Sequence, residues 1–282
     1  MSCMFGPAGT PEEFAVLGYK KTLDIPSYIE AKGLDLFEYQ CGRGVNVSNE
    51  KAVEFGNAAA QKNVTLSLHA PYYISMSSTE EEKRLNSVNY ILQSARAVNA
   101  MGGDRIVVHT GSCGKISRET ALELALDTMK KSLAALDGEN LGNVHICPET
   151  MGKVNQLGTL REVTKLCRLD ERLIPCIDFG HLNARDQGYF KALADYETVF
   201  KTILCDLGEY RLKNFHAHFS KIEYSAGGEK RHLTFEDTVY GPDFEPVLEL
   251  CLKYGCNTHF ICESAGTQGI DAKQMKDYYF RR

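Results

Sequence analysis

Short apolar runs that end in histidine, aspartate or glutamate recur along the chain and alternate with helical patterns. Six such runs cover residues 64–68, 105–108, 144–148, 173–178, 212–215 and 258–262. At or directly after their ends stand His69, His109, Glu149, Asp178, His216 with His218, and Glu263. Because apolar runs of this length bounded by turn residues are typical of buried strands, each run predicts a strand with a chemically active side chain at its end.

Two further apolar runs, residues 2–9 and 34–39, bring the predicted strands to eight, and helical patterns separate them. Helices are expected at about 49–62, 79–101, 117–136, 157–168, 189–207, 243–254 and 271–279. Strands that alternate with helices indicate a parallel sheet, and eight such units predict a closed (β/α)₈ TIM barrel. We expect residues 1–282 to form one such domain. Active sites of this fold lie at the carboxyl ends of the strands, where the candidate side chains are predicted to lie.

Two segments are expected to shape the site. The run 173–178 ends in Asp178, and a turn at Phe179 and Gly180 is predicted to bring His181 to the same rim, although Pro175 is unfavourable inside a strand. Residues 220–240 are polar and long for a connection between a strand and a helix, which predicts a functional loop.

Composition narrows the class of protein. The net charge of −5 argues against binding a polyanion over the whole surface. No apolar run approaches the ~20 residues that span a bilayer, and the first residues lack the pattern of a signal peptide. Ten cysteines without CxxC spacing predict free thiols in a reducing compartment. We therefore expect a cytoplasmic protein without a membrane segment.

The predicted strand ends combine three imidazoles with three carboxylates. This mixture suits Zn²⁺, and also Mn²⁺ or Fe²⁺. The ligands exceed what one tetrahedral zinc ion requires, which predicts two metal ions that share a carboxylate. Paired metal ions suit phosphoester hydrolysis, since one activates water and both stabilise the attacking and leaving oxygens.

Several motifs resemble the endonuclease IV family of zinc-dependent apurinic/apyrimidinic endonucleases, within the xylose-isomerase-like barrels. They run in family order and cover residues 67–72, 108–112, 147–150, 176–181, 216–221, 230–232 and 262–264, and the most specific is His69-Ala70-Pro71-Tyr72. The resemblance implies two zinc ions and a possible third. His69, His109 and Glu149 match ligands of the first zinc; Glu149, Asp178, His216 and Glu263 match ligands of the second; His181 and His232 match ligands of the third.

The chain departs from the family pattern at three places. Lys230 occupies the position of the aspartate that binds the third zinc, and an ammonium group cannot bind a metal ion while charged; the adjacent Glu229 is a candidate substitute. His218 is an additional candidate ligand. The loop after the second strand holds Arg43 as its one evident cation, where binding to a DNA backbone favours several.

The resemblance implies a hydrolase that cuts DNA at abasic sites, on a nucleotide flipped out of the duplex. We expect the protein to be a monomer. Glu263 or Glu149 would hold the nucleophile. Tyr72 and Tyr73 would fill the gap in the DNA, while Arg43 and Arg231 would contact phosphates.

Two other readings stay open. In a sugar isomerase or epimerase of the same superfamily, one divalent metal ion would be held by Glu149, Asp178, His216 and Glu263, and His69 and His109 would be superfluous. The second is a metal-binding barrel without catalytic activity.

Overall fold

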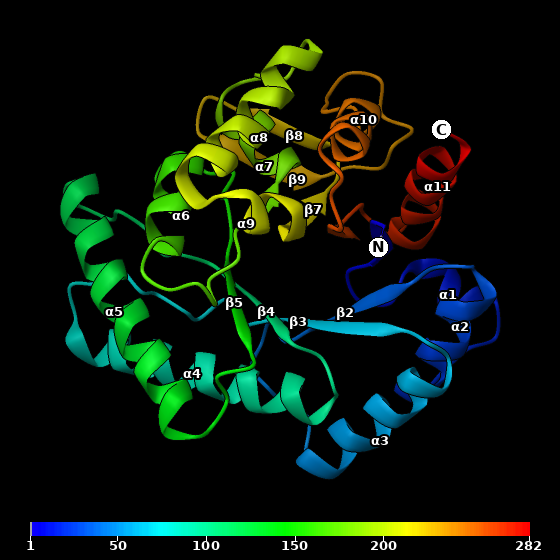
Figure 1. Cartoon of the computed structure of the whole chain (residues 1–282), viewed down its shortest axis with the longest axis horizontal. Helices are drawn as coiled ribbons and strands as arrows, with labels where there is room; N and C mark the ends of the chain where they lie inside the picture. The colour runs from blue at the N-terminus through cyan, green and yellow to red at the C-terminus, as the bar shows by residue number, and fades with distance from the viewer. Residues whose placement is uncertain (1) are drawn as a thin grey trace.

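Eight parallel strands form the centre of the computed structural model, which describes residues 2–282 (Figure 1). They form two arcs, β1-β10-β7-β6 and β2-β3-β4-β5, and single bridges between Ala8 and Glu38 and between Glu149 and Cys176 join the arcs at both seams. The sheet therefore closes, and the predicted (β/α)₈ barrel is confirmed. Its strands are β1 (Met4–Pro7), β2 (Leu36–Gln40), β3 (Thr65–His69), β4 (Arg105–Val108), β5 (His145–Pro148), β6 (Cys176–Asp178), β7 (His216–Phe219) and β10 (His259–Cys262).

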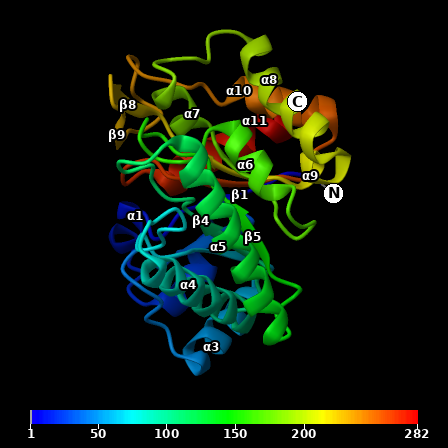
Figure 2. The same ribbon diagram turned by 90° about the vertical axis from the view of Figure 1, so that its left-hand side faces the viewer.

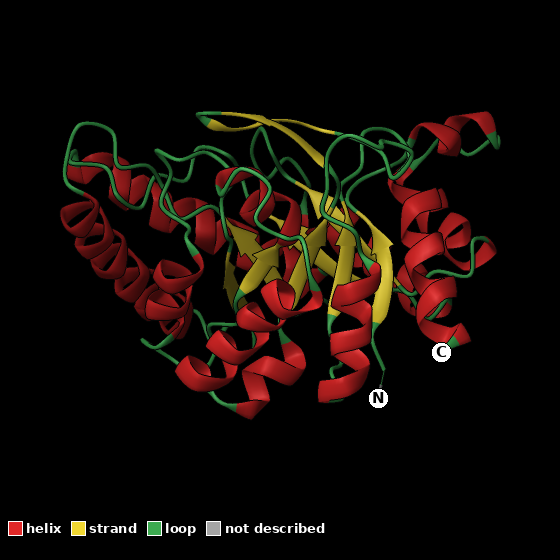
Figure 3. Cartoon of the chain, turned by 90° about the horizontal axis from the view of Figure 1, so that it is seen from above, coloured by secondary structure: helices red, strands yellow, loops and turns green. Residues whose placement is uncertain are grey.

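Helices surround the barrel, and the strands point toward the side where the long loops gather (Figure 3). Helices α4, α5 and α6 lie side by side on one flank (Figure 2). The helices are α1 (Glu12–Val16), α2 (Ile25–Ala31), α3 (Asn49–Gln61), α4 (Glu81–Ala100), α5 (Arg118–Gly138), α6 (Leu160–Cys167), α7 (Phe179–Arg185), α8 (Leu193–Leu207), α9 (Glu209–Asn214), α10 (Glu245–Tyr254) and α11 (Gln268–Arg281), with a 3₁₀ turn at Thr22–Asp24.

Local sequence signals explain where several helices begin. The side chains of Ser48, Ser117 and Thr159 accept hydrogen bonds from backbone N–H groups in the first turns of α3, α5 and α6. Such caps satisfy N–H groups that the helix itself leaves unpaired. Within residues 2–282, no helix is long and apolar enough to cross a membrane. All ten cysteines are free, as predicted.

The seventh strand differs from the prediction by about four residues. Residues 212–215 were expected as the strand, but Leu212 lies in helix α9, and strand β7 begins at His216. Leu212 and Phe215 are both buried, and their spacing of three residues fits a helical turn as well as a strand end. As a result His216 starts the strand instead of ending it, which changes the site described below.

The predicted turn at Phe179 and Gly180 is the first turn of a helix. Strand β6 is short, and helix α7 follows it directly. The Asp178 carboxylate caps this helix by accepting a hydrogen bond of 2.6 Å from the His181 backbone N–H. One helical turn thus brings His181 beside Asp178, so the two side chains share a rim, as predicted, by a different local structure.

The polar segment 220–240 contains an antiparallel hairpin, β8 (Ile222–Ser225) and β9 (Gly228–His232), which lies over the carboxyl side of the barrel (Figure 3). Its tip is bound to the loop after β5, because the Glu229 N–H donates to the Gly152 carbonyl at 3.0 Å. Gly228 has a φ of +90°, and a Cβ there would lie 2.1 Å from the same carbonyl oxygen. Glycine at this position therefore allows the hairpin to dock and form one wall of the site.

Candidate metal centre

A cavity of about 480 Å³ opens at the carboxyl ends of the strands. Its walls contain most of the predicted site residues together with polar residues that the sequence did not single out. The lining residues are Ala8, Gln40, His69, Tyr72, His109, Glu149, Met151, Lys153, Gln156, His181, Glu229, His232, Glu263 and Gln268. Three groups of side chains here have the donor types and spacing of metal ligands.

The first group is His69, His109 and Glu149. Nε2 of His69 and Nε2 of His109 lie 3.5 and 3.3 Å from Oε2 of Glu149. Nδ1 of His69 lies 2.8 Å from the Ala70 carbonyl oxygen, to which it donates as an N–H. This hydrogen bond leaves Nε2 free to bind a metal ion, which is the usual arrangement around histidine ligands.

The second group is Glu149, Asp178, His218 and Glu263. Nδ1 of His218 lies 3.2 Å from Oε1 of Glu149 and 3.4 Å from Oε1 of Glu263. Glu149 therefore turns one oxygen to each group, which is the geometry of a bridging ligand. Glu149 Oε2 and Asp178 Oδ2 are buried without a hydrogen-bond partner in the described chain. Unpaired buried carboxylate oxygens are costly, and bound cations would satisfy them.

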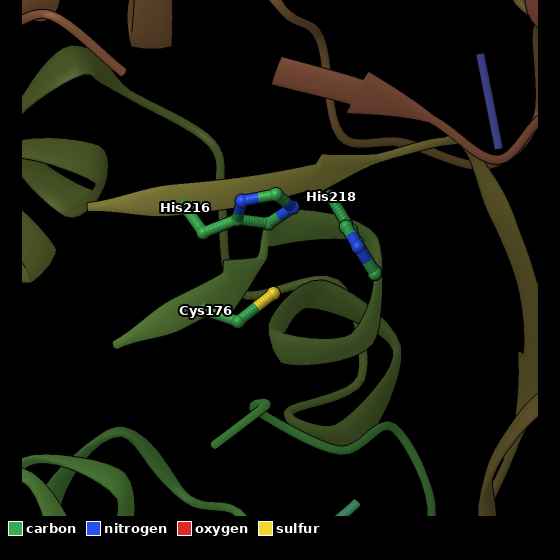
Figure 4. A group of neighbouring side chains, drawn as sticks. All are labelled: Cys176, His216 and His218. Carbon is green, nitrogen blue, oxygen red and sulfur yellow. The ribbon is translucent and has the colours of Figure 1, made fainter. Parts of the chain in front are cut away.

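The position of His216 differs from the one expected at the strand end. Its ring is fully buried inside the barrel, and Nε2 is 3.0 Å from Oε2 of Glu38, below the strand ends. Side chains two residues apart on a strand point to the same face, so His218 extends from β7 in the same direction but nearer the mouth. His218 thus occupies the place that was expected for His216. Figure 4 shows both rings beside the thiol of Cys176 from the neighbouring strand, a third buried residue with metal-ligand chemistry.

The third group is His181, Glu229 and His232, from α7 and the hairpin. Nε2 of His181 lies 3.4 Å from Oε2 of Glu229, and Nδ1 of His232 lies 2.8 Å from the Ser220 hydroxyl.

A bulge in β9 explains why Glu229 faces the group. Glu223 pairs with Arg231 and Tyr224 pairs with Glu229, so Lys230 is the extra residue between them. A bulge re-aims the side chains around it, which places Glu229 and His232 on one face although they are three residues apart.

Lys230 points away from the third group and pairs with Glu223. We expect Glu229→Gln to reduce the bound metal by about one equivalent, because glutamine lacks the charge of the ligand. The matched variant Lys230→Gln should retain the full metal content. Elemental analysis of both variants after gel filtration checks this prediction. Loss of metal in Lys230→Gln with retention in Glu229→Gln would show that the hairpin has a different register.

The side chains of these three groups shift one another's pKa values. Burial, together with the nearby carboxylates Glu263 and Glu149, raises the pKa of Asp178 to about 6, although His181 opposes the shift. Burial alone would also raise the pKa of Glu149, but the imidazoles of His218, His109 and His181 hold it well below its usual range. The neighbouring imidazoles therefore favour the ionised form of this central carboxylate, which is the form that binds metal ions.

The four residues predicted to contact DNA are all exposed, and one of them is paired with a carboxylate of the protein itself. The Tyr72 ring lies at the cavity mouth, with 59% of the residue exposed, and its centroid is 5.5 Å from that of His69. Tyr73 is exposed beside it and packs on Tyr90. Arg43 is also exposed. Arg231 instead forms an ion pair of 2.7 Å with Glu223 on the hairpin.

Lys153 is the one lysine or arginine among the residues that line the cavity, and it was not predicted from the sequence. It follows Glu149 by four residues in the loop after β5, a position that suggests proximity to the site once the strand is assigned. Gln40, Gln156 and Gln268 were also missed, because glutamine carries no motif of its own.

Comparison with known proteins places these groups in context. The family model described as xylose isomerase-like TIM barrel matches residues 27–278. An uncharacterized protein of Methanocaldococcus jannaschii is 32% identical over 98% of this chain and 96% of its own length. A protein named probable endonuclease 4 of Mycoplasma pneumoniae is 29% identical over 62% of this chain and 60% of its own length.

Solved structures with the same fold include both nucleases and epimerases. Endonuclease IV of Thermus thermophilus superimposes with a TM-score of 0.69 at 17% identity, over 99% of this chain and all of that chain. The 3-keto-D-glucoside 4-epimerase of E. coli gives a TM-score of 0.70 at 13% identity and covers both chains fully. At these identities the likeness establishes the fold alone, and the activity has to be inferred from the residues of the site.

Proposed function

Since this chain belongs to the xylose isomerase-like TIM barrel family, we propose that it is a metal-dependent phosphodiesterase of the endonuclease IV type, which binds zinc and cleaves DNA at abasic sites. The observation that carries the proposal is the position of Glu149. Its two oxygens face two separate groups of ligands, 3.3 Å from His109 on one side and 3.2 Å from His218 on the other. A shared carboxylate between two groups is the arrangement that holds paired metal ions.

The donor set fits zinc. Imidazole and carboxylate are zinc ligands, and each group supplies three or four of them. Bound zinc ions would supply Lewis acidity and lower the pKa of water. The side chains of the first and second groups would hold these ions, with Glu149 between them.

The remaining steps belong to residues at the cavity mouth. Glu263 follows β10, and 15% of its side chain is exposed, so its carboxylate can orient an attacking water and accept its proton. Lys153 would contact a phosphate oxygen of the substrate. Tyr72, exposed at the rim, would stack in the gap left by a displaced nucleotide, as aromatic rings do against bases.

A sugar isomerase or epimerase is the second candidate, and the second group favours it. Glu149, Asp178, His218 and Glu263 form a complete set for one divalent metal ion without any other residue. Arg231 and Lys230 also pair with Glu223, which reduces the positive charge available to a DNA backbone. The phosphodiesterase ranks first because it also uses His69 and His109.

A cleavage assay tests the proposal. A duplex oligonucleotide with one abasic site should be cut 5′ to that site by the zinc-loaded protein, and an intact duplex of the same sequence should remain uncut. Dialysis against a chelator should abolish cleavage, and added zinc should restore it. If the metal-loaded protein leaves the abasic duplex intact but epimerises ketoses, the proposed function is wrong and the second candidate is supported.

A further inference from the structure

A buried carboxylate lies under the metal centre, and no strand-end pattern predicts it. Glu38 projects from the middle of β2 into the barrel and is fully buried. Its Oε2 accepts hydrogen bonds from the Ser67 hydroxyl at 2.9 Å and from His216 Nε2 at 3.0 Å. Its Oε1 accepts from the Gln40 amide at 3.3 Å and lies 3.0 Å from Nε2 of His218.

His218 therefore lies between two sets of carboxylates. Nδ1 faces Glu149 and Glu263 at the mouth, while Nε2 faces Glu38 below. The contact between Nε2 and Glu38 is close but bent, since Nε2 has no well-aligned hydrogen-bond partner in the described chain. Histidines that bind a metal ion through one nitrogen usually donate the other N–H to a carboxylate, a backbone carbonyl or a water, which fixes the tautomer and the direction of the ring.

We infer that Glu38 is a positioning residue that holds the His218 ring with Nδ1 directed at the second metal group. The inference rests on the proposed function, because it gives His218 the role of a metal ligand. Ser67 and His216 hold the Glu38 carboxylate from the opposite side, and all three contacts are inside the barrel. In this arrangement His216 supports the centre from below instead of binding the metal ion.

A carboxylate below the ring is the partner that His218 needs to keep a proton on Nε2 while Nδ1 binds a cation.

A metal ion held by Cys176, His216 and His218 is the competing explanation of the same cluster (Figure 4). The ligand atoms of these three residues lie within 4.8 Å of one another, and Nδ1 of His216 has no hydrogen-bond partner in the described chain. Nδ1 of His218 already faces the second group, and His216 Nε2 already bonds to Glu38. The observed contacts therefore favour the positioning role, and the metal content of Cys176→Ser separates the two explanations.

The test compares metal affinity in wild type and four variants by competition with a chromophoric chelator. The relevant equivalent is the one that wild type binds and His218→Gln lacks. Glu38→Gln should weaken it about tenfold and Glu38→Leu about a hundredfold, the range observed for partners of metal-bound histidines. The control is Glu162→Gln, because Glu162 is a buried carboxylate that pairs with Arg118 and does not line the cavity. It should leave the affinity unchanged even if it lowers the melting temperature.

A spectroscopic readout separates positioning from simple destabilisation. Cobalt(II) substituted into the centre should show an altered d–d absorption spectrum in Glu38→Gln and an unaltered one in Glu162→Gln. Unchanged affinity and spectrum in folded Glu38→Gln would overturn the inference. Loss of one metal equivalent in Cys176→Ser would overturn it as well, in favour of a ligand role for the thiol. A wild-type protein that binds no metal would refute the proposed function itself, so the two failures are distinguishable.

Discussion

Glu263→Gln is expected to lower cleavage of an abasic duplex by roughly 10²–10⁴-fold, the usual contribution of a positioned general base. Glutamine keeps the shape of the side chain and its contact near His218, but it cannot accept a proton from water. Steady-state kinetics on the zinc-loaded variant measure the effect. Since Glu263 lies at the rim and not in the apolar core, the free energy of unfolding of the metal-free protein should change by about 0.5 kcal/mol or less.

The matched control is Glu249→Gln, because Glu249 is also a partly exposed glutamate but lies on α10, where it pairs with Arg282. This variant should cleave at the wild-type rate. Full activity in Glu263→Gln would remove the role assigned to this carboxylate. A collapse of metal content in the same variant would instead show that Glu263 acts mainly as a ligand.

The pair His218→Gln and His216→Gln should give opposite results, although both change a buried histidine on the same strand. His218→Gln should lose one metal equivalent and with it several kcal/mol of transition-state stabilisation, on the order of a thousandfold in rate. His216→Gln should retain the metal and lose stability of about 1–3 kcal/mol, because it disturbs the hydrogen bonding of the buried Glu38 carboxylate.

Elemental analysis and thermal unfolding of the two variants test this contrast. The reverse pattern, with metal lost in His216→Gln and kept in His218→Gln, would restore the ligand assignment expected from the sequence. Loss of metal in both variants would instead support a metal ion held by Cys176, His216 and His218.

The closed barrel could be predicted because each unit carries a local signal. Apolar runs mark the strands, and capping residues such as Ser48 and Ser117 mark where helices begin. Helix α9 and strand β7 were predicted wrongly, because Leu212 and Phe215 fit either structure and the sequence alone does not show which one buries them. Because the strand begins at His216 instead of ending there, His218 and not His216 lies beside Glu149, Asp178 and Glu263.

The site was predictable where its residues directly follow apolar runs. His69, His109, Glu149, Asp178 and Glu263 all belong to the groups expected at the strand ends. The residues that were missed depend on contacts distant in sequence or on irregular backbone. Glu38, which was missed, contacts His216 across 178 positions of the chain. Glu229 was expected only as a candidate substitute at the position of Lys230, and it faces its group because of a bulge that no motif reveals.

The positions of bound metal ions would distinguish a paired metal centre from a site for a single ion. Crystals grown with zinc would be measured on both sides of its absorption edge, and the anomalous difference map would locate each ion. We predict one ion between His69, His109 and Glu149, a second between Glu149, Asp178, His218 and Glu263, and a third at His181, Glu229 and His232. A single ion held by the second group, with His69 and His109 free of metal, would contradict the paired centre and favour the isomerase chemistry of the same fold.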